Sequence, residues 1–180
     1  MRSIKTVRLA TSFLILSLAI LLAGCPNNVK KGMSNPKVQE ALTKIFEQKQ
    51  LSESAVAEKE KGFKDKPEAL QEVKKLYNTA AAKGNAFIEI VQLNLTAGTL
   101  QESDLEPRAK EVVEAVYRLQ EYPNPPAKAI PVGIGDLIVG LTNAGIAIWK
   151  ETKNEQMAIV ENVKKELEKR KWEKYEKLPH

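Results

Sequence analysis

Cysteine and histidine, the two residue types that most often carry nucleophilic, acid–base or metal chemistry, occur once each in this chain of 180 residues, as Cys25 and His180. A single cysteine forms neither an intramolecular disulfide nor a cysteine-rich zinc site. A lone histidine in the last position leaves no cluster for a metal ion and no buried imidazole to act as a general base. We therefore expect no metal site and no cofactor.

Catalytic motifs are also scarce. Ser34 and Lys37 have the S-x-x-K spacing of some serine acyltransferases, but Pro36 lies between them and the partner motifs S-D-N and K-T-G are missing. There is no G-x-S-x-G, P-loop or G-x-G-x-x-G motif. An enzyme would have to work with carboxylate, lysine or tyrosine side chains alone. We interpret the S-x-x-K match as chance and predict that the protein is not an enzyme.

Cys25 follows a segment with the features of an export signal. Its positive n-region has no acidic residue and carries its charges at Arg2, Lys5 and Arg8. An apolar run of 14 residues follows, from Leu9 to Leu22, broken only by Thr11, Ser12 and Ser17. This run is shorter than the roughly 20 residues of a membrane-spanning helix and has the length of a signal-peptide h-region. Residues 1–24 are therefore expected to be a cleaved signal peptide.

The four residues Leu22-Ala23-Gly24-Cys25 resemble the lipobox of bacterial lipoproteins at every position. The resemblance implies transfer of diacylglycerol to the Cys25 sulfur, cleavage between Gly24 and Cys25, and acylation of the new amino terminus, with palmitate as a suitable label. Three acyl chains exceed the two signals needed for stable membrane attachment. The alternatives are an ordinary secretory signal with an unrelated cysteine, or a retained membrane anchor.

The residue after Cys25 bears on localisation in the cell envelope. In enteric lipoproteins an Asp at this position often marks retention in the inner membrane, whereas this chain has Pro26. The resemblance therefore favours the periplasmic side of the outer membrane over the inner membrane, if the cell is Gram-negative.

Removal of residues 1–24 changes the charge of the protein. It takes away three basic residues and no acidic one, so 25 Lys and Arg remain against 23 Asp and Glu, a net charge of +2 instead of +5. A strongly basic balance would favour a polyanionic partner. Because most of that excess leaves with the signal peptide, we expect no nucleic-acid binding.

The mature chain is expected to be all-α, an antiparallel hairpin or bundle of about four helices. Residues 25–35 form a lipidated tether, and residues 36–122 form a helical domain. Its first helix follows Pro36, with a break expected near Ser52. Apolar residues then recur at alternating spacings of three and four over 67–97, as in a coiled coil, and again over 104–121. These two helices should pack as an antiparallel hairpin.

Four of the nine prolines fall within 123–131, too densely for a helix, so this segment is expected to be an extended strut. Beyond it, residues 132–180 are expected to form a glycine-rich apolar helix that continues into a charged C-terminal helix reaching about Leu178. Trp172 and Tyr175 lie among the basic residues of that last part, a composition that could also suit a lipid headgroup surface.

Residues 130–149 carry one charge and four glycines, and Gly140 and Ala144 form a small-xxx-small pair. We expect these residues to be buried core, with membrane insertion, alone or as a pore-type oligomer, as the alternative. Gly84, Gly140 and Ala144 are candidate positions for close helix packing or for self-association into a homo-oligomer.

The pattern as a whole predicts a membrane-anchored, non-enzymatic interaction or structural module with an envelope protein as partner. Two settings remain open, a complex of the cell envelope and an envelope factor encoded by a phage.

Overall fold

The computed structural model describes residues 35–124 and 133–175. Within these residues the chain forms five packed α-helices and no strand, which confirms the expected all-α helical bundle. The helices are α3 (Pro36–Gly62), α4 (Pro67–Ala97), α5 (Glu102–Glu121), α6 (Ile134–Thr152) and α7 (Met157–Glu168).

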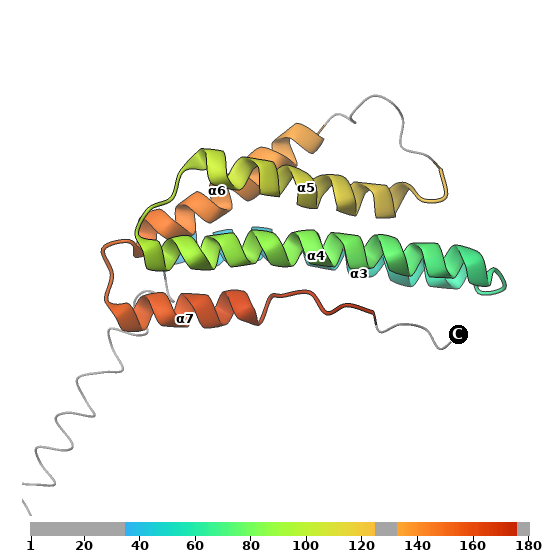
Figure 1. Ribbon diagram of the computed structural model, residues 1–180, viewed down its shortest axis with the longest axis horizontal. Helices are drawn as coiled ribbons and strands as arrows, with labels where there is room; N and C mark the ends of the chain where they lie inside the picture. The colour runs from blue at the N-terminus through green and yellow to red at the C-terminus, as the bar shows by residue number, and fades with distance from the viewer. Residues whose placement is uncertain (1–34, 125–132, 176–180) are drawn as a thin grey trace, which may run out of the picture.

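Four of these helices, α3 to α6, form an up-and-down bundle in which each helix runs antiparallel to the one before it (Figure 1). In cross-section α3 lies beside α4 and α6, and α5 lies beside α4 and α6. The fifth helix, α7, packs on the outside of the bundle, chiefly against α4. The end of α4, the start of α5, the end of α6 and the start of α7 therefore share one end of the molecule (Figure 1).

Helix α3 runs unbroken through the position where we expected an interruption. Its N-cap is Asn35, whose side-chain oxygen accepts a hydrogen bond of 3.0 Å from the backbone N–H of Lys37. Ser52 lies buried within the helix, and its hydroxyl donates to the carbonyl of Gln48 at 3.1 Å. This bond satisfies the serine inside the helix, so the polar residue does not end it.

The predicted apolar faces of α4 and α5 are confirmed. On α4 the buried residues include Val73, Tyr77, Ala80, Gly84, Phe87 and Val91. On α5 they include Leu105, Ala109, Val112, Val116 and Leu119. Both series lie in the shared core of the bundle, and the predicted antiparallel hairpin of these two helices is present (Figure 1).

Helix α6 contributes one face to that core. Leu141, Ala144 and Ile148 are buried, as expected for a core helix. Gly145 lies so close to α5 that a Cβ on it would come within 2.7 Å of the Leu105 side chain. Leu137 and Val139, near the start of the helix, are exposed. Among the described helices, none is long and apolar enough to cross a bilayer.

The predicted continuous helix from residue 132 to about 178 is wrong in two places. Helix α6 ends at Thr152, and a turn over 153–156 separates it from α7. The four residues from Lys153 to Gln156 are polar and exposed, so a helix there would have nothing to bury against the bundle. Helix α7 then ends at Glu168, and the chain continues without regular structure to Tyr175.

Several predictions concern residues outside the described ones. These are the signal peptide, Gly24 and Cys25, the tether up to Ser34, the proline-rich segment beyond Asn124, and the last five residues.

Candidate interaction surface

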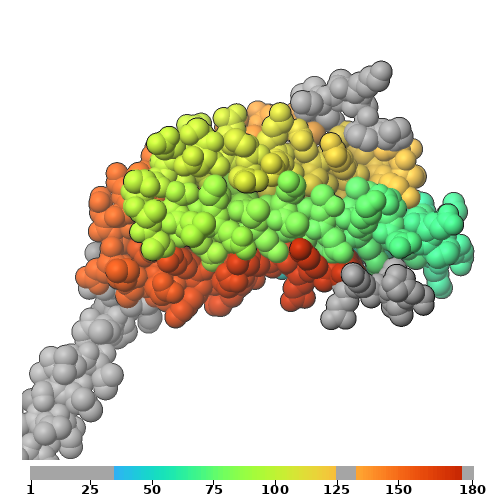
Figure 2. Space-filling view, in the orientation of Figure 1, coloured from blue at the N-terminus to red at the C-terminus, as the bar shows by residue number. Residues whose placement is uncertain are grey.

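The most distinctive feature of the molecule is the way residues 169–175 lie along α4. After α7 the chain follows the outer surface of α4 toward that helix's N-terminal end (Figure 1). Figure 2 shows α7 and this segment as a continuous ridge along one edge of the body. We refer to residues 169–175 as the C-terminal segment, and to the surface of α3 and α4 that receives it as the groove.

Asn85 of α4 holds the backbone of the segment at Trp172. The Asn85 Oδ1 accepts a hydrogen bond of 2.7 Å from the Trp172 N–H, and the Asn85 Nδ2 donates one of 3.0 Å to the Trp172 carbonyl. One side-chain amide thus satisfies both backbone groups of a residue, as a neighbouring strand would do in a sheet.

Asn78 repeats this arrangement seven residues earlier on α4. Its Oδ1 accepts from the Tyr175 N–H at 2.8 Å, and its Nδ2 donates to the Tyr175 carbonyl at 3.3 Å. Because residues seven apart lie on the same face of a helix, the two asparagines form a row along α4. Lys49 of α3 adds a third hold, since its ammonium donates to the Lys171 carbonyl at 3.1 Å.

The Trp172 ring fills the space left by Gly84. Trp172 is 4% exposed. A Cβ on Gly84 would lie 2.6 Å from Cε2, 2.8 Å from Cζ2 and 2.9 Å from Cδ2 of the ring. Such distances are well inside van der Waals contact, so a side chain at this position would displace the indole. Within the chain, the close neighbour of Gly84 is thus the C-terminal segment, whereas we expected a helix there.

An aromatic contact fixes the far end of the segment. The rings of Tyr175 and Tyr77 meet edge to face at 5.1 Å, and the Lys74 ammonium lies 5.4 Å from the Tyr175 ring centre. Burial, with a smaller contribution from the charge of Glu53, raises the pKa of Tyr77 to about 12. The phenol therefore stays neutral at physiological pH and packs as an apolar group with a polar tip.

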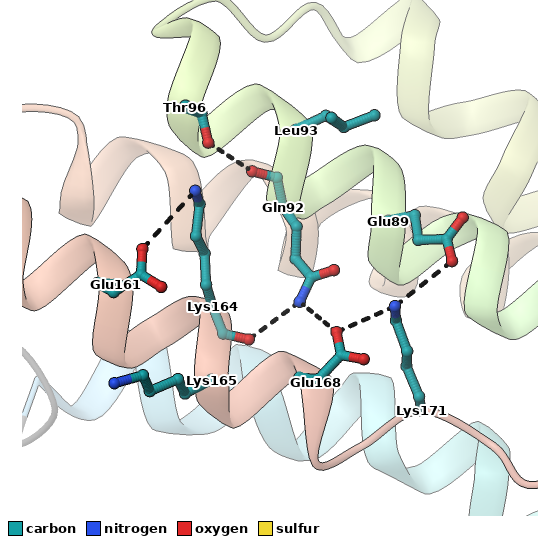
Figure 3. Close-up of a pocket in the computed structure, with 9 residues that line it drawn as sticks. All are labelled: Glu89, Gln92, Leu93, Thr96, Glu161, Lys164, Lys165, Glu168 and Lys171. Atoms are coloured by element: carbon teal, nitrogen blue, oxygen red, sulfur yellow. Dashed lines mark hydrogen bonds and ion pairs between the residues drawn. The ribbon is translucent and has the colours of Figure 1, made fainter.

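A second, polar contact region lies beside the groove, between α4 and α7. Figure 3 shows Gln92 of α4 pointing at α7, where its Nε2 donates to the Lys164 carbonyl at 3.0 Å and to the Glu168 carboxylate at 3.1 Å. Lys171 bridges Glu168 at 3.0 Å and Glu89 of α4 at 3.4 Å. The hydrogen bonds from Lys171 and Gln92 hold the pKa of the Glu168 carboxyl below its usual range. Leu93, which is 69% exposed, borders this region (Figure 3).

The other two predicted packing positions lie apart from this surface. Ala144 is buried in the core of the bundle. Gly140 faces away from it, and a Cβ there would find no atom within 4 Å. The chain itself therefore uses one of the pair for packing and leaves the other open.

The described residues contain no group of three or more His, Cys, Asp or Glu side chains that could hold a metal ion. No family model, no curated protein and no solved structure matches this chain.

The two asparagines were not identified from the sequence as binding residues. The sequence did contain one indication of such a site. Asn78 and Asn85 place two side-chain amides on the helix, and Gly84 leaves a position without a side chain beside one of them. Their role depends on a partner segment about ninety residues away in the chain, which periodicity within α4 does not reveal.

Proposed function

We propose that this protein is a bacterial lipoprotein, a lipid-anchored and non-enzymatic helical module of the cell envelope that acts through protein–protein contact. The observation that carries the proposal is the sequence Leu22-Ala23-Gly24-Cys25 after a signal-like segment, with the only cysteine of the chain at the position that receives lipid in lipoproteins.

The position of Asn35 favours a particular orientation at the membrane. Asn35 lies beside the C-terminal end of α6, where its side chain donates to Glu151 at 3.0 Å and Lys37 bridges the same carboxylate at 3.1 Å. The ten residues from Cys25 to Asn35 span at most about 35 Å. A lipid on Cys25 would therefore keep this end of the bundle nearest the membrane, with the groove extending away from it along α4.

The ionisable groups support a non-enzymatic role. The described carboxyls with a displaced pKa, Glu111, Glu151, Glu166 and Glu168, all have it lowered, chiefly by hydrogen bonds from lysine, arginine or amide side chains. A lowered pKa is typical of a surface ion pair, whereas a catalytic acid needs a raised one. We propose that the partner is another envelope protein and that the outer membrane is its site in a Gram-negative cell.

The lipid anchor is tested by metabolic labelling with radioactive palmitate. Cys25→Ser should abolish labelling and leave an unprocessed precursor, whereas Ser34→Ala, a small change nine residues after the lipobox cysteine, should be labelled and processed like the wild type. Labelling that persists in Cys25→Ser would refute the proposal.

The alternative is that residues 130–149 insert into a bilayer. It would require α6 to leave the bundle and lose the burial of Leu141 and Ile148. Dye release from liposomes and protection of 130–149 from protease distinguish the two functions. Release together with protection would support insertion, and the absence of both would exclude it.

A further inference from the structure

The segment that fills the groove follows α7, and α7 is joined to the four-helix bundle by one short connection, residues 153–156. Helix α7 and the C-terminal segment together form what we call the arm, residues 157–175. We propose that the arm is exchangeable: the groove of one copy of this chain accepts the arm of a second copy, and reciprocal exchange joins two copies into a dimer.

The arm packs on the outside of the four-helix bundle, where its Val163, Leu167 and Trp172 join the same hydrophobic core. Helix α7 buries Ile159, Val163 and Leu167, chiefly against α4. The segment beyond it is held by side chains of α3 and α4 rather than by strand pairing. The core between α3, α4, α5 and α6 keeps its own buried residues, including Leu42, Phe87, Leu119 and Ile148. When the arm leaves as a unit, the four helices of the bundle keep their contacts with one another.

The connection between α6 and α7 can extend without strain. Residues 153–156 include no glycine and no proline, and none of them has a positive φ. Lys153 is already helical, with φ −58° and ψ −28°, whereas Gln156 is extended, with φ −65° and ψ 147°. If residues 153–156 became helical, α6 and α7 would merge into one helix. The merged helix would extend about 24 Å beyond Thr152 and carry the arm out of reach of its own groove.

The sequence of the connection is compatible with an open form, in which α6 and α7 are one helix. Residues 153–156 are polar and exposed and include no glycine or proline, so their sequence does not prevent a helix. Within one chain the closed form, in which the arm lies in its own groove, is more stable because it buries Trp172 and the apolar face of α7. In an exchanged dimer these groups are buried equally well in the partner's groove.

Fit and hydrogen bonding, together with one ion pair, identify the arm itself as the occupant of the groove. The C-terminal segment carries Lys169, Arg170, Lys171 and Lys174 against one acid, Glu173. The groove side presents Glu89, which pairs with Lys171 at 3.4 Å, and the charges of Glu53 and Glu60 act on Tyr175. A second copy brings this basic aromatic segment together with α7, and it reproduces every contact described above.

Competition within the chain makes the exchange dependent on concentration. A tethered segment acts at an effective concentration of about a millimolar or more, so the closed monomer dominates in dilute solution. Crowding of copies in one membrane leaflet would favour the dimer. The inference concerns the body of the protein and holds whether or not Cys25 carries lipid.

The test uses two full-length variants purified in detergent, each unable to close on itself. Trp172→Ala leaves the groove intact and disables the arm, whereas Gly84→Leu leaves the arm intact and blocks the groove. Each variant is labelled with one dye of an energy-transfer pair, and circular dichroism checks that both remain helical. Mixing should give a heterodimer signal at least tenfold above that of either variant mixed with itself. Asn85→Ala replaces Gly84→Leu if the larger side chain prevents folding.

An unchanged signal on mixing would overturn the proposal, and so would equal self-association of the Trp172→Ala chain, because that chain has no competent arm. A labelled peptide of residues 168–175 is then added to the Trp172→Ala chain. Binding of the peptide without any heterodimer would overturn exchange between copies and indicate a foreign extended peptide as the occupant. These outcomes are independent of palmitate labelling, so the failure of either proposal is recognisable by itself.

Discussion

Substitution of two glycines by alanine provides a direct measurement of the contact between α4 and the C-terminal segment. Gly84 and Gly140 both lie inside helices, so replacing either by alanine should gain about 0.5–1 kcal/mol from helix propensity and a less flexible unfolded chain. Their surroundings differ. The new methyl group meets the Trp172 ring at 2.6–2.9 Å in one case and no atom within 4 Å in the other.

The indole cannot move away from Gly84 at no cost. Asn85, the next residue of α4, holds both the N–H and the carbonyl of Trp172. Insertion of a methylene-sized group into a well-packed contact costs about 1–3 kcal/mol. We therefore expect Gly140→Ala to raise the free energy of unfolding by up to about 1 kcal/mol. Gly84→Ala should leave it unchanged or lower it by up to about 2 kcal/mol.

The comparison is made by urea unfolding followed by circular dichroism, with tryptophan fluorescence as the second probe. Because the propensity gain is common to both variants, the difference between them measures the Trp172 contact alone, and we expect about 1–3 kcal/mol. If Gly84→Ala stabilises the protein as much as Gly140→Ala does, the indole does not pack on Gly84, and the groove as described is refuted.

Two further predictions test the groove. Asn85→Ala removes both hydrogen bonds to Trp172 and should lower the free energy of unfolding by about 1–3 kcal/mol. The control Asn143→Ala, on the exposed face of α6, should change this free energy little. Equal effects of the two variants in urea unfolding would contradict the role of Asn85. Because burial raises the pKa of Tyr77 to about 12 from an ordinary value near 10, its contribution to stability is complete below about pH 10 and is lost as the pH rises toward about 12. Tyr77→Phe should reduce this alkaline loss, measured as the urea midpoint against pH, and an unchanged profile would show that Tyr77 is not the responsible group.

The sequence was sufficient for the parts of the fold that depend on local periodicity. The spacing of Val73, Tyr77, Ala80, Phe87 and Val91 predicted the core face of α4, and Leu105 to Leu119 predicted that of α5, because each series repeats every three or four residues. Pro36 and Pro67 also marked helix starts, since a fixed φ and a missing N–H are tolerated in the first turn.

What the sequence could not predict depends on contacts between distant segments. The helix expected to reach Leu178 ends at Glu168, because Trp172 gains more by packing on Gly84 than the chain gains by remaining helical. Ser52 suggested a break in the first helix because it is a polar residue in an apolar pattern. Its hydroxyl instead donates to the Gln48 carbonyl one turn earlier, and the helix continues. The helix expected over 104–121 begins slightly earlier, at Glu102, where the N–H of Gln101 donates to the Asp104 carboxylate at 3.4 Å.

The central claim, that this is a lipid-anchored protein, is tested most directly by mass spectrometry of the N-terminal peptide from the membrane fraction. The account predicts a chain that begins at Cys25 and carries diacylglycerol on sulfur and an acyl chain on the amine, and therefore no reactive thiol. A chain that begins elsewhere, or one that begins at Cys25 with a free thiol and a free amine, would contradict it.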